Sequence, residues 1–124
     1  MSHHEIVTTD HIEYASKDPA ATRKFLEKTL GFHFRVMEEM GGYGLRTDEV
    51  KRGSGAGVRL IEKGENSGTI AYHTVMNLDE TLKAVQAEGA KVVVPKMEVP
   101  GMGWHAVVHA PGDVLVGLYQ SSRP

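Results

Sequence analysis

Residues 11–32 read HIEYASKDPAATRKFLEKTLGF, and this stretch decides how the chain folds. Side chains of two unlike kinds alternate through residues 11–16, which is the period-two pattern of a strand with two different faces. Asp18 then stands where a helix cap is needed, and Pro19 suits the first helical position because its missing N–H leaves no bond unmade there. Gly31 ends the helix as a left-handed cap. The stretch therefore predicts a strand, a helix and the start of a second strand.

A similar segment, HTVMNLDETLKAVQAEGAKVVV, begins at residue 73. It predicts a strand at 70–77 and a helix that Asp79 caps and Gly89 ends. Three further strands follow each helix, and their expected ranges are 32–38, 43–49 and 57–63 in the first half and 91–94, 104–110 and 113–120 in the second. Chain breaks are expected at Pro95, 100–103 and 111–113. Each half thus has the order β-α-β-β-β, which is an internal repeat.

The repeat predicts an α+β fold in a single domain, residues 1–124, made of two βαβββ units at about 5–63 and 69–120. One helix covers only one face of a four-stranded sheet, so the other face must curve around something or pack on a partner. Two such units side by side would form a curved mixed sheet whose inner face is a cup, with both helices on the outside.

Composition excludes several classes of function. The chain of 124 residues has 14 Lys and Arg against 16 Asp and Glu, and no basic run is longer than a pair, so a nucleic-acid partner is not expected. No apolar stretch is long enough for a membrane span, and the start, MSHHEIVTTD, lacks the apolar segment of a signal peptide. The absence of cysteine excludes disulfides and thiolate chemistry. We expect a cytoplasmic protein without a membrane partner.

Paired βαβββ units, each opened by a histidine, resemble the vicinal oxygen chelate superfamily. That superfamily contains glyoxalase I, extradiol dioxygenases, fosfomycin-modifying enzymes and bleomycin-resistance proteins. The resemblance runs from about Asp10 to Gln120, and its second half is carried by HTVMNLDETLKAVQAEGAKVVVPK (73–96) and HAPGDVLVGLYQ (109–120). The segment GAKVVVPKMEVPGMGW and the closing GLYQ are similar to an uncharacterised glyoxalase-like branch.

The resemblance implies a metal site built from four sheet positions, two in each unit. His11 and His73 fall on its two histidine positions, whereas Arg59 and Gly117 stand where carboxylates are usual. If a metal is bound, the two histidines are its first ligands, Glu13 supplies the missing carboxylate, and Zn, Ni, Fe or Mn would suit the set. Alternatively Glu13 forms an ion pair with Arg59, which is the interpretation we prefer, and the protein then has no metal cofactor.

Four positions are candidates for substrate binding. An arginine directed into the cup needs an anion, so Arg59 would hold a protein carboxylate or an anionic substrate, or else extend to the rim. Gly117 would leave room for a ligand, and without a carboxylate there ordinary glyoxalase I activity is not expected. Trp104 and Tyr119 would supply apolar walls.

Three hypotheses for function follow. The first is a glyoxalase-type lyase or dioxygenase-related enzyme that acts on a small oxygenated molecule with a divalent metal. The second is a metal-free protein that binds a small molecule, as bleomycin-resistance proteins do. The third is a metal-free enzyme in which His73 or His105 is the general base. In each case we expect a homodimer, with the units paired either within one chain or between two chains.

Overall fold

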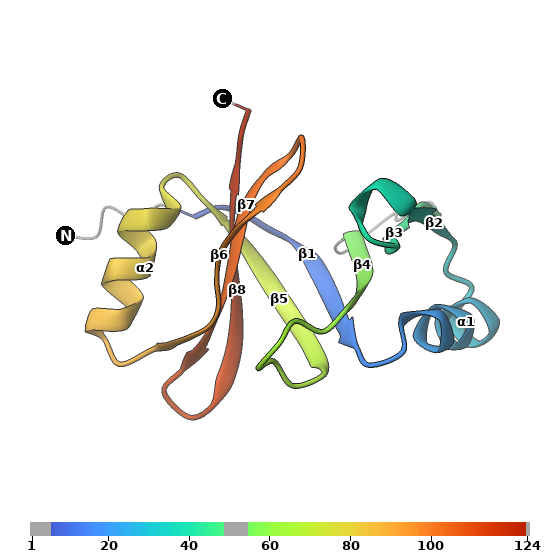
Figure 1. Ribbon diagram of the computed structural model, residues 1–124, viewed down its shortest axis with the longest axis horizontal. Helices are drawn as coiled ribbons and strands as arrows, with labels where there is room; N and C mark the ends of the chain where they lie inside the picture. Colours follow the sequence, from blue (N-terminus) through green and yellow to red (C-terminus); the bar gives the residue numbers. More distant parts are fainter. Residues whose placement is uncertain (1–5, 49–54, 124) are drawn as a thin grey trace. The chain divides into compact units, whose positions relative to one another are not determined.

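The computed structural model describes residues 6–48 and 55–123. Its elements, shown in Figure 1, are β1 (Ile6–Ser16), α1 (Pro19–Leu30), β2 (Phe34–Met37), a short 3-10 helix (Glu38–Met40), β3 (Tyr43–Arg46), β4 (Gly55–Leu60), β5 (Gly68–Val75), α2 (Leu78–Ala87), β6 (Lys91–Val99), β7 (Gly103–Ala110) and β8 (Val114–Ser121). No helix in these two ranges is both long and apolar enough to cross a membrane.

Eight strands form one mixed sheet. The chain divides into two compact units. The N-terminal unit is Asp10–Ile70, where the strand order is β2-β3-β4-β1. The C-terminal unit runs from Ala71 onward and includes the start of β1 up to Thr9, and its own strands follow the order β5-β8-β7-β6. The predicted α+β class and the two βαβββ repeats are confirmed.

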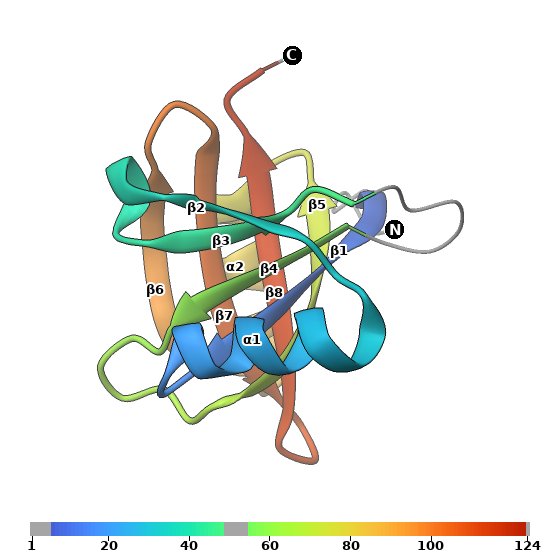
Figure 2. The ribbon, with the colours of Figure 1, turned by 90° about the vertical axis from the view of Figure 1, so that its right-hand side faces the viewer.

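Helix α1 forms where the sequence predicts it. Asp18 accepts a hydrogen bond of 3.2 Å from the backbone of the first turn, and Gly31 ends the helix with a φ of 75°. Leu26 is the buried residue of this helix, whereas Phe25 and Leu30 are 61% and 63% exposed. Figure 2 shows α1 beside the strands of its own unit.

Helix α2 begins two residues earlier than the sequence analysis placed it. Its cap is Asn77, whose side-chain oxygen accepts from the backbone N–H of Glu80 at 3.0 Å, so the expectation that Asp79 caps the helix is wrong. Asparagine and aspartate are nearly equal as caps, and Asp79 instead lies in the first turn, where its charge favours the helix dipole.

His11 and His73 do not occupy equivalent positions relative to their helix caps. His11 stands seven residues before its cap, Asp18, whereas His73 stands four residues before Asn77. Side chains alternate between the two faces of a strand, so an odd spacing in one unit and an even spacing in the other place the two histidines on unlike faces of their own units. The spacing from His73 to Asp79, six residues, is also even, so this difference does not depend on which residue caps the helix.

Helix α2 packs on one face of the C-terminal unit. The buried core there consists of Val75, Leu78, Ala106 and Leu118, with Leu82, Val85, Trp104 and Val116 packed against it. We call this the α2 face, and the other side of the same strands the open face.

Strand β6 continues through Pro95, where a break was expected. It lies at the edge of the sheet, and its pairing with β7 shifts register between Val92 and Val94 and again between Val94 and Met97. A proline is tolerated at such an irregular edge because the ladder does not require its missing N–H.

Candidate functional site

In the N-terminal unit, β1 carries the candidate residues on the face that α1 leaves open. Ser16 lies on the helix side, where its hydroxyl is 2.7 Å from that of Thr22 on α1. His11 and Glu13 occupy the other face because their positions have the opposite parity. Strand β4 runs parallel to β1, and its register places Gly57 beside Glu13.

The carboxylate of Glu13 joins three side chains from three strands. His11 Nε2 lies 2.6 Å from Glu13 Oε2, and the hydroxyl of Tyr43 donates to the same oxygen at 2.9 Å. The Tyr43 hydroxyl also lies 3.0 Å from His11 Nε2. Arg59 Nε is 3.3 Å from the second oxygen, Oε1, which confirms the preferred ion pair between Glu13 and Arg59.

Arg59 also forms a two-pronged ion pair with Glu65. Both terminal nitrogens of the guanidinium lie 2.7 Å from a carboxylate oxygen of Glu65, and both residues are buried. The backbone N–H of Glu62 donates to the same carboxylate at 2.9 Å. Arg59 therefore does not extend to a rim, and the anion that it binds is a protein carboxylate. We call the set His11, Glu13, Tyr43, Arg59 and Glu65 the Glu13 cluster.

Gly57 makes the Glu13 cluster possible. A Cβ atom at this position would lie 1.7 Å from the Tyr43 hydroxyl oxygen, so any side chain would take the space through which Tyr43 reaches Glu13 and His11. Neither Gly57 nor Glu65 was predicted as a site residue.

The contacts of the Glu13 cluster indicate which tautomer His11 adopts. The Glu13 carboxylate faces the Arg59 guanidinium, and an ionised carboxylate only accepts hydrogen bonds. With this carboxylate as the acceptor, the assigned tautomer of neutral His11 carries its hydrogen on Nε2. The His11 side chain is 32% exposed, so a small molecule can reach the ring.

The side chains expected to bind a metal do not form a suitable donor set. Among residues 6–48 and 55–123, no three His, Cys, Asp or Glu side chains are grouped closely enough to hold an ion. His11 and Glu13 direct their polar atoms at each other, and the Arg59 cation lies beside the second oxygen of Glu13. A divalent cation would have to displace these contacts and would meet a guanidinium, which is an unfavourable neighbour.

His73 lies on the α2 face of the C-terminal unit, whereas we expected it on the open face. It pairs in register with Leu118 and shares its side of β5 with Val75, both of which belong to the core under α2. His73 Nδ1 is 2.8 Å from the Thr9 hydroxyl oxygen.

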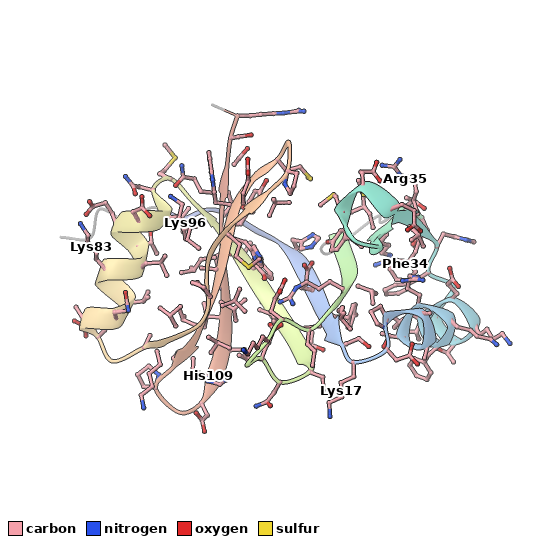
Figure 3. The ribbon with its side chains drawn as sticks, in the orientation of Figure 1. Lys17, Phe34, Arg35, Lys83, Lys96 and His109 are labelled. Atoms are coloured by element: carbon pink, nitrogen blue, oxygen red, sulfur yellow. The ribbon has the colours of Figure 1, made fainter. Side chains whose placement is uncertain are left out.

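Trp104 also lies on the α2 face. Lys96 on β6 pairs with Asp79 of α2 at 3.1 Å, and its ammonium lies 5.5 Å from the centre of the Trp104 ring. Figure 3 shows Lys96 on the side of β6 that α2 covers. Trp104 and Tyr119, expected as two walls of one site, therefore lie on opposite faces of the sheet.

The open face of the C-terminal unit carries a second contact between a tyrosine and a histidine. The Tyr72 hydroxyl oxygen lies 3.0 Å from His105 Nδ1, and the two rings are 6.0 Å apart. Gly117 pairs in register with Tyr72, and Tyr119 pairs with His105. The space over Gly117, expected to receive a ligand, is taken by the Tyr72 ring.

Replacing Gly117 with alanine should destabilise the protein by about 1–3 kcal/mol, the usual cost of overpacking. The added Cβ would lie 2.7–2.8 Å from three atoms of the Tyr72 ring. Urea unfolding of Gly117→Ala, Tyr72→Ala and the double variant measures this effect. The loss of stability caused by Gly117→Ala should largely disappear when Tyr72→Ala is also present. An equal loss in both backgrounds would show that the Tyr72 ring is not the cause.

The predicted residues thus separate into three groups. His11, Glu13 and Arg59 meet in the Glu13 cluster, while the open face of the C-terminal unit holds His105, Gly117 and Tyr119. His73 and Trp104 lie on the α2 face.

Comparison with known proteins shows which chains share this architecture. The sequence profile of the Glyoxalase/Bleomycin resistance protein/Dioxygenase superfamily matches residues 8–114. No curated protein matches the chain.

Several solved structures share the fold. Methylmalonyl-CoA epimerase from Mycobacterium tuberculosis is 14% identical over 98% of this chain and 93% of its own, with a TM-score of 0.63. Methylmalonyl-CoA epimerase from Streptomyces coelicolor, in complex with 2-nitronate-propionyl-CoA, is 23% identical over 95% and 99%, with a TM-score of 0.57. A Legionella pneumophila protein described as an NAD-dependent benzaldehyde dehydrogenase is 14% identical over 90% and 98%, with a TM-score of 0.64. At these identities the likeness shows the fold alone.

Proposed function

Since the chain belongs to the Glyoxalase/Bleomycin resistance protein/Dioxygenase superfamily, we propose that it catalyses proton transfer on a small oxygen-containing organic molecule. His11 takes up the proton at Nδ1, and Glu13 is the positioning residue that orients the imidazole. No divalent ion is held by these two side chains.

The 2.6 Å contact between His11 and Glu13 is the observation that supports this proposal most strongly. A carboxylate that accepts from one ring nitrogen fixes the tautomer, presents the other nitrogen as a base and stabilises the imidazolium that forms. Tyr43 and Arg59 hold the carboxylate itself, so the orientation is set before a substrate arrives.

The solved structures that share the fold include epimerases. Epimerisation at a carbon that bears hydrogen needs a group that removes a proton and a group that returns one. A proton-transfer role for His11 is therefore chemistry of the same kind, with an imidazole as the proton acceptor.

Two other functions are weaker candidates. Metal-dependent lyase or dioxygenase chemistry would need the Glu13 cluster to open and release His11 and Glu13. Small-molecule binding without turnover was expected to use Arg59 to hold an anionic ligand, but Glu13 and Glu65 already engage that guanidinium. Homodimer formation and a cytoplasmic location remain predictions.

Nitrogen NMR of the imidazoles tests the proposed tautomer without a substrate. We expect neutral His11 to carry its hydrogen on Nε2, and we expect this preference to weaken in the Glu13→Gln variant, because an amide can donate to the ring as well as accept from it. The matched control is His33→Asn, which removes an exposed histidine whose backbone N–H donates to Asp48 and whose carbonyl accepts from Thr47. A neutral His11 protonated at Nδ1 would contradict the assignment of the base.

Solvent-deuterium incorporation tests turnover. A panel of small carbonyl compounds and their thioesters, beginning with methylmalonyl-CoA because the structural neighbours are its epimerases, is incubated in deuterium oxide with the full-length protein. Exchange should fall by about 10²–10⁴-fold in His11→Asn, the usual range for losing a general base, and should persist in His33→Asn. Exchange that is equal in both variants would contradict the proposed role of His11.

A further inference from the structure

The C-terminal unit has a small hollow that the proposed function does not use. It has a volume of about 250 Å³ and is lined by Gly101, Met102, Tyr119, Ser121 and Arg123. Figures 1 and 2 both show the turn between β6 and β7 at the same edge of this unit as the end of β8. We propose that this hollow binds a small carboxylic acid, with Arg123 as the partner of the carboxylate and Tyr119 and Met102 around the carbon body.

Hydrogen bonds hold the turn against β8 and keep the hollow formed. The carbonyl oxygen of Met102 accepts from the Tyr119 hydroxyl at 2.8 Å and from the backbone N–H and the hydroxyl of Ser122 at 2.9 and 3.0 Å. Three donors on one carbonyl fix the turn at its tip. A ligand therefore meets walls that are already in place, which reduces the entropy lost on binding.

The walls are apolar and aromatic. Tyr119 presents its ring beside the hollow while its hydroxyl is held by the turn, and Met102 is an exposed thioether that adapts to irregular shapes. Burial raises the pKa of the Tyr119 phenol above its ordinary value, so the ring stays neutral at physiological pH. A neutral phenol does not repel a bound anion.

Arg123 supplies the positive charge. It lines the hollow together with Tyr119, and its charge opposes the effect of burial on the Tyr119 pKa. Within residues 6–48 and 55–123, no carboxylate forms an ion pair with this guanidinium, whereas Arg46 and Arg59 both have acidic partners. A planar guanidinium binds a carboxylate through two parallel hydrogen bonds, which favours a carboxylic acid over a neutral ligand.

The volume limits the size of the acid. About 250 Å³ lies below the range of roughly 300–1,000 Å³ that is usual for drug-sized ligands. The hollow thus suits an acid with one aromatic ring or a short branched chain. His105 is the neighbour of Tyr119 across β7 and β8, so the resonances of its ring can report a change at Tyr119.

The test is an NMR titration of the full-length protein with benzoate and with benzamide, which has the same shape and no charge. Resonances of the Met102 methyl group and the His105 ring are followed. We expect saturable shifts with benzoate, and affinity lower by about tenfold or more for benzamide and for Arg123→Gln, because a charge-assisted contact is lost. The matched control, Arg35→Gln, removes an exposed arginine on β2 (Figure 3) and should bind benzoate normally.

Three results would overturn the proposal: no saturable benzoate binding, equal binding of benzamide, or full affinity in Arg123→Gln. The His11→Asn variant should bind benzoate as the unmodified protein does. Separate variants in separate units therefore distinguish a failure of carboxylic-acid binding in the hollow from a failure of the proposed proton transfer.

Discussion

Replacing Glu65 with alanine is expected to lower the free energy of unfolding by about 3–5 kcal/mol, the usual cost of removing one partner of a buried ion pair. The change leaves the Arg59 guanidinium buried without its two contacts of 2.7 Å to Glu65. It also removes the acceptor of the Glu62 backbone N–H. Urea unfolding monitored by circular dichroism measures the loss, and the thermal midpoint should fall by about 10 °C or more.

Two comparisons separate this effect from a general loss of charge. Glu80→Gln removes an exposed carboxylate that lies 3.9 Å from Lys83, and it should change stability by less than about 0.5 kcal/mol. Combining Arg59→Met and Glu65→Leu with Glu13→Gln should recover part of the loss, since it removes all three charges of the buried network together. A Glu65→Ala variant as stable as Glu80→Gln would contradict the arrangement of the Glu13 cluster.

Gly57→Ala should be the most disruptive single-methyl change in the N-terminal unit. Its Cβ would lie 1.7 Å from the Tyr43 hydroxyl oxygen and 2.3 Å from the ring carbon that carries it, so the ring would have to leave. Overpacking and the loss of the Tyr43 hydrogen bond to the Glu13 carboxylate together should cost about 2–5 kcal/mol.

A double-mutant cycle tests the cause. Tyr43→Ala removes the ring, so adding Gly57→Ala to it should cost little, and the two changes should be strongly non-additive. Tyr43→Phe removes only the hydroxyl and gives the cost of the hydrogen bond alone. Additive effects of Gly57→Ala and Tyr43→Ala would show that Tyr43 does not pass over Gly57.

The fold and the superfamily could both be predicted from the sequence. The repeated pattern of capped helix and alternating strands depends on local chemistry, and α1 has its cap at Asp18 and its end at Gly31 as expected. The superfamily inferred from the resemblance is confirmed by the profile match over residues 8–114.

The cap of α2 and the face of His73 were both predicted wrongly, for separate reasons. Asn77 and Asp79 are both acceptable caps, and local sequence does not choose between them; the packing of Leu78 into the core does. His73 stands six residues before Asp79 and four before Asn77, both even spacings, whereas His11 stands seven residues before Asp18, so the two histidines are not equivalent with either cap. Tyr72, at an odd spacing from either cap, is the residue of β5 that faces the open side.

The partners within the Glu13 cluster could not be predicted from spacing. Glu65 follows the end of β4 in an irregular segment, and its approach to Arg59 depends on the path of that segment. Tyr43 reaches Glu13 across β4, a contact between residues 30 positions apart in sequence. A signal was present in Gly57, because a glycine within a strand often marks a close approach by another group.

Measuring metal content and zinc affinity together tests the central claim, that the Glu13 cluster is satisfied by its own side chains. The protein is purified without a histidine tag, analysed for Zn, Ni, Fe and Mn, and then titrated with zinc alongside the His11→Ala and Glu13→Gln variants. We predict far less than one metal per chain and a zinc response that is the same in all three proteins. One tightly bound metal per chain that is lost in both variants would contradict the account.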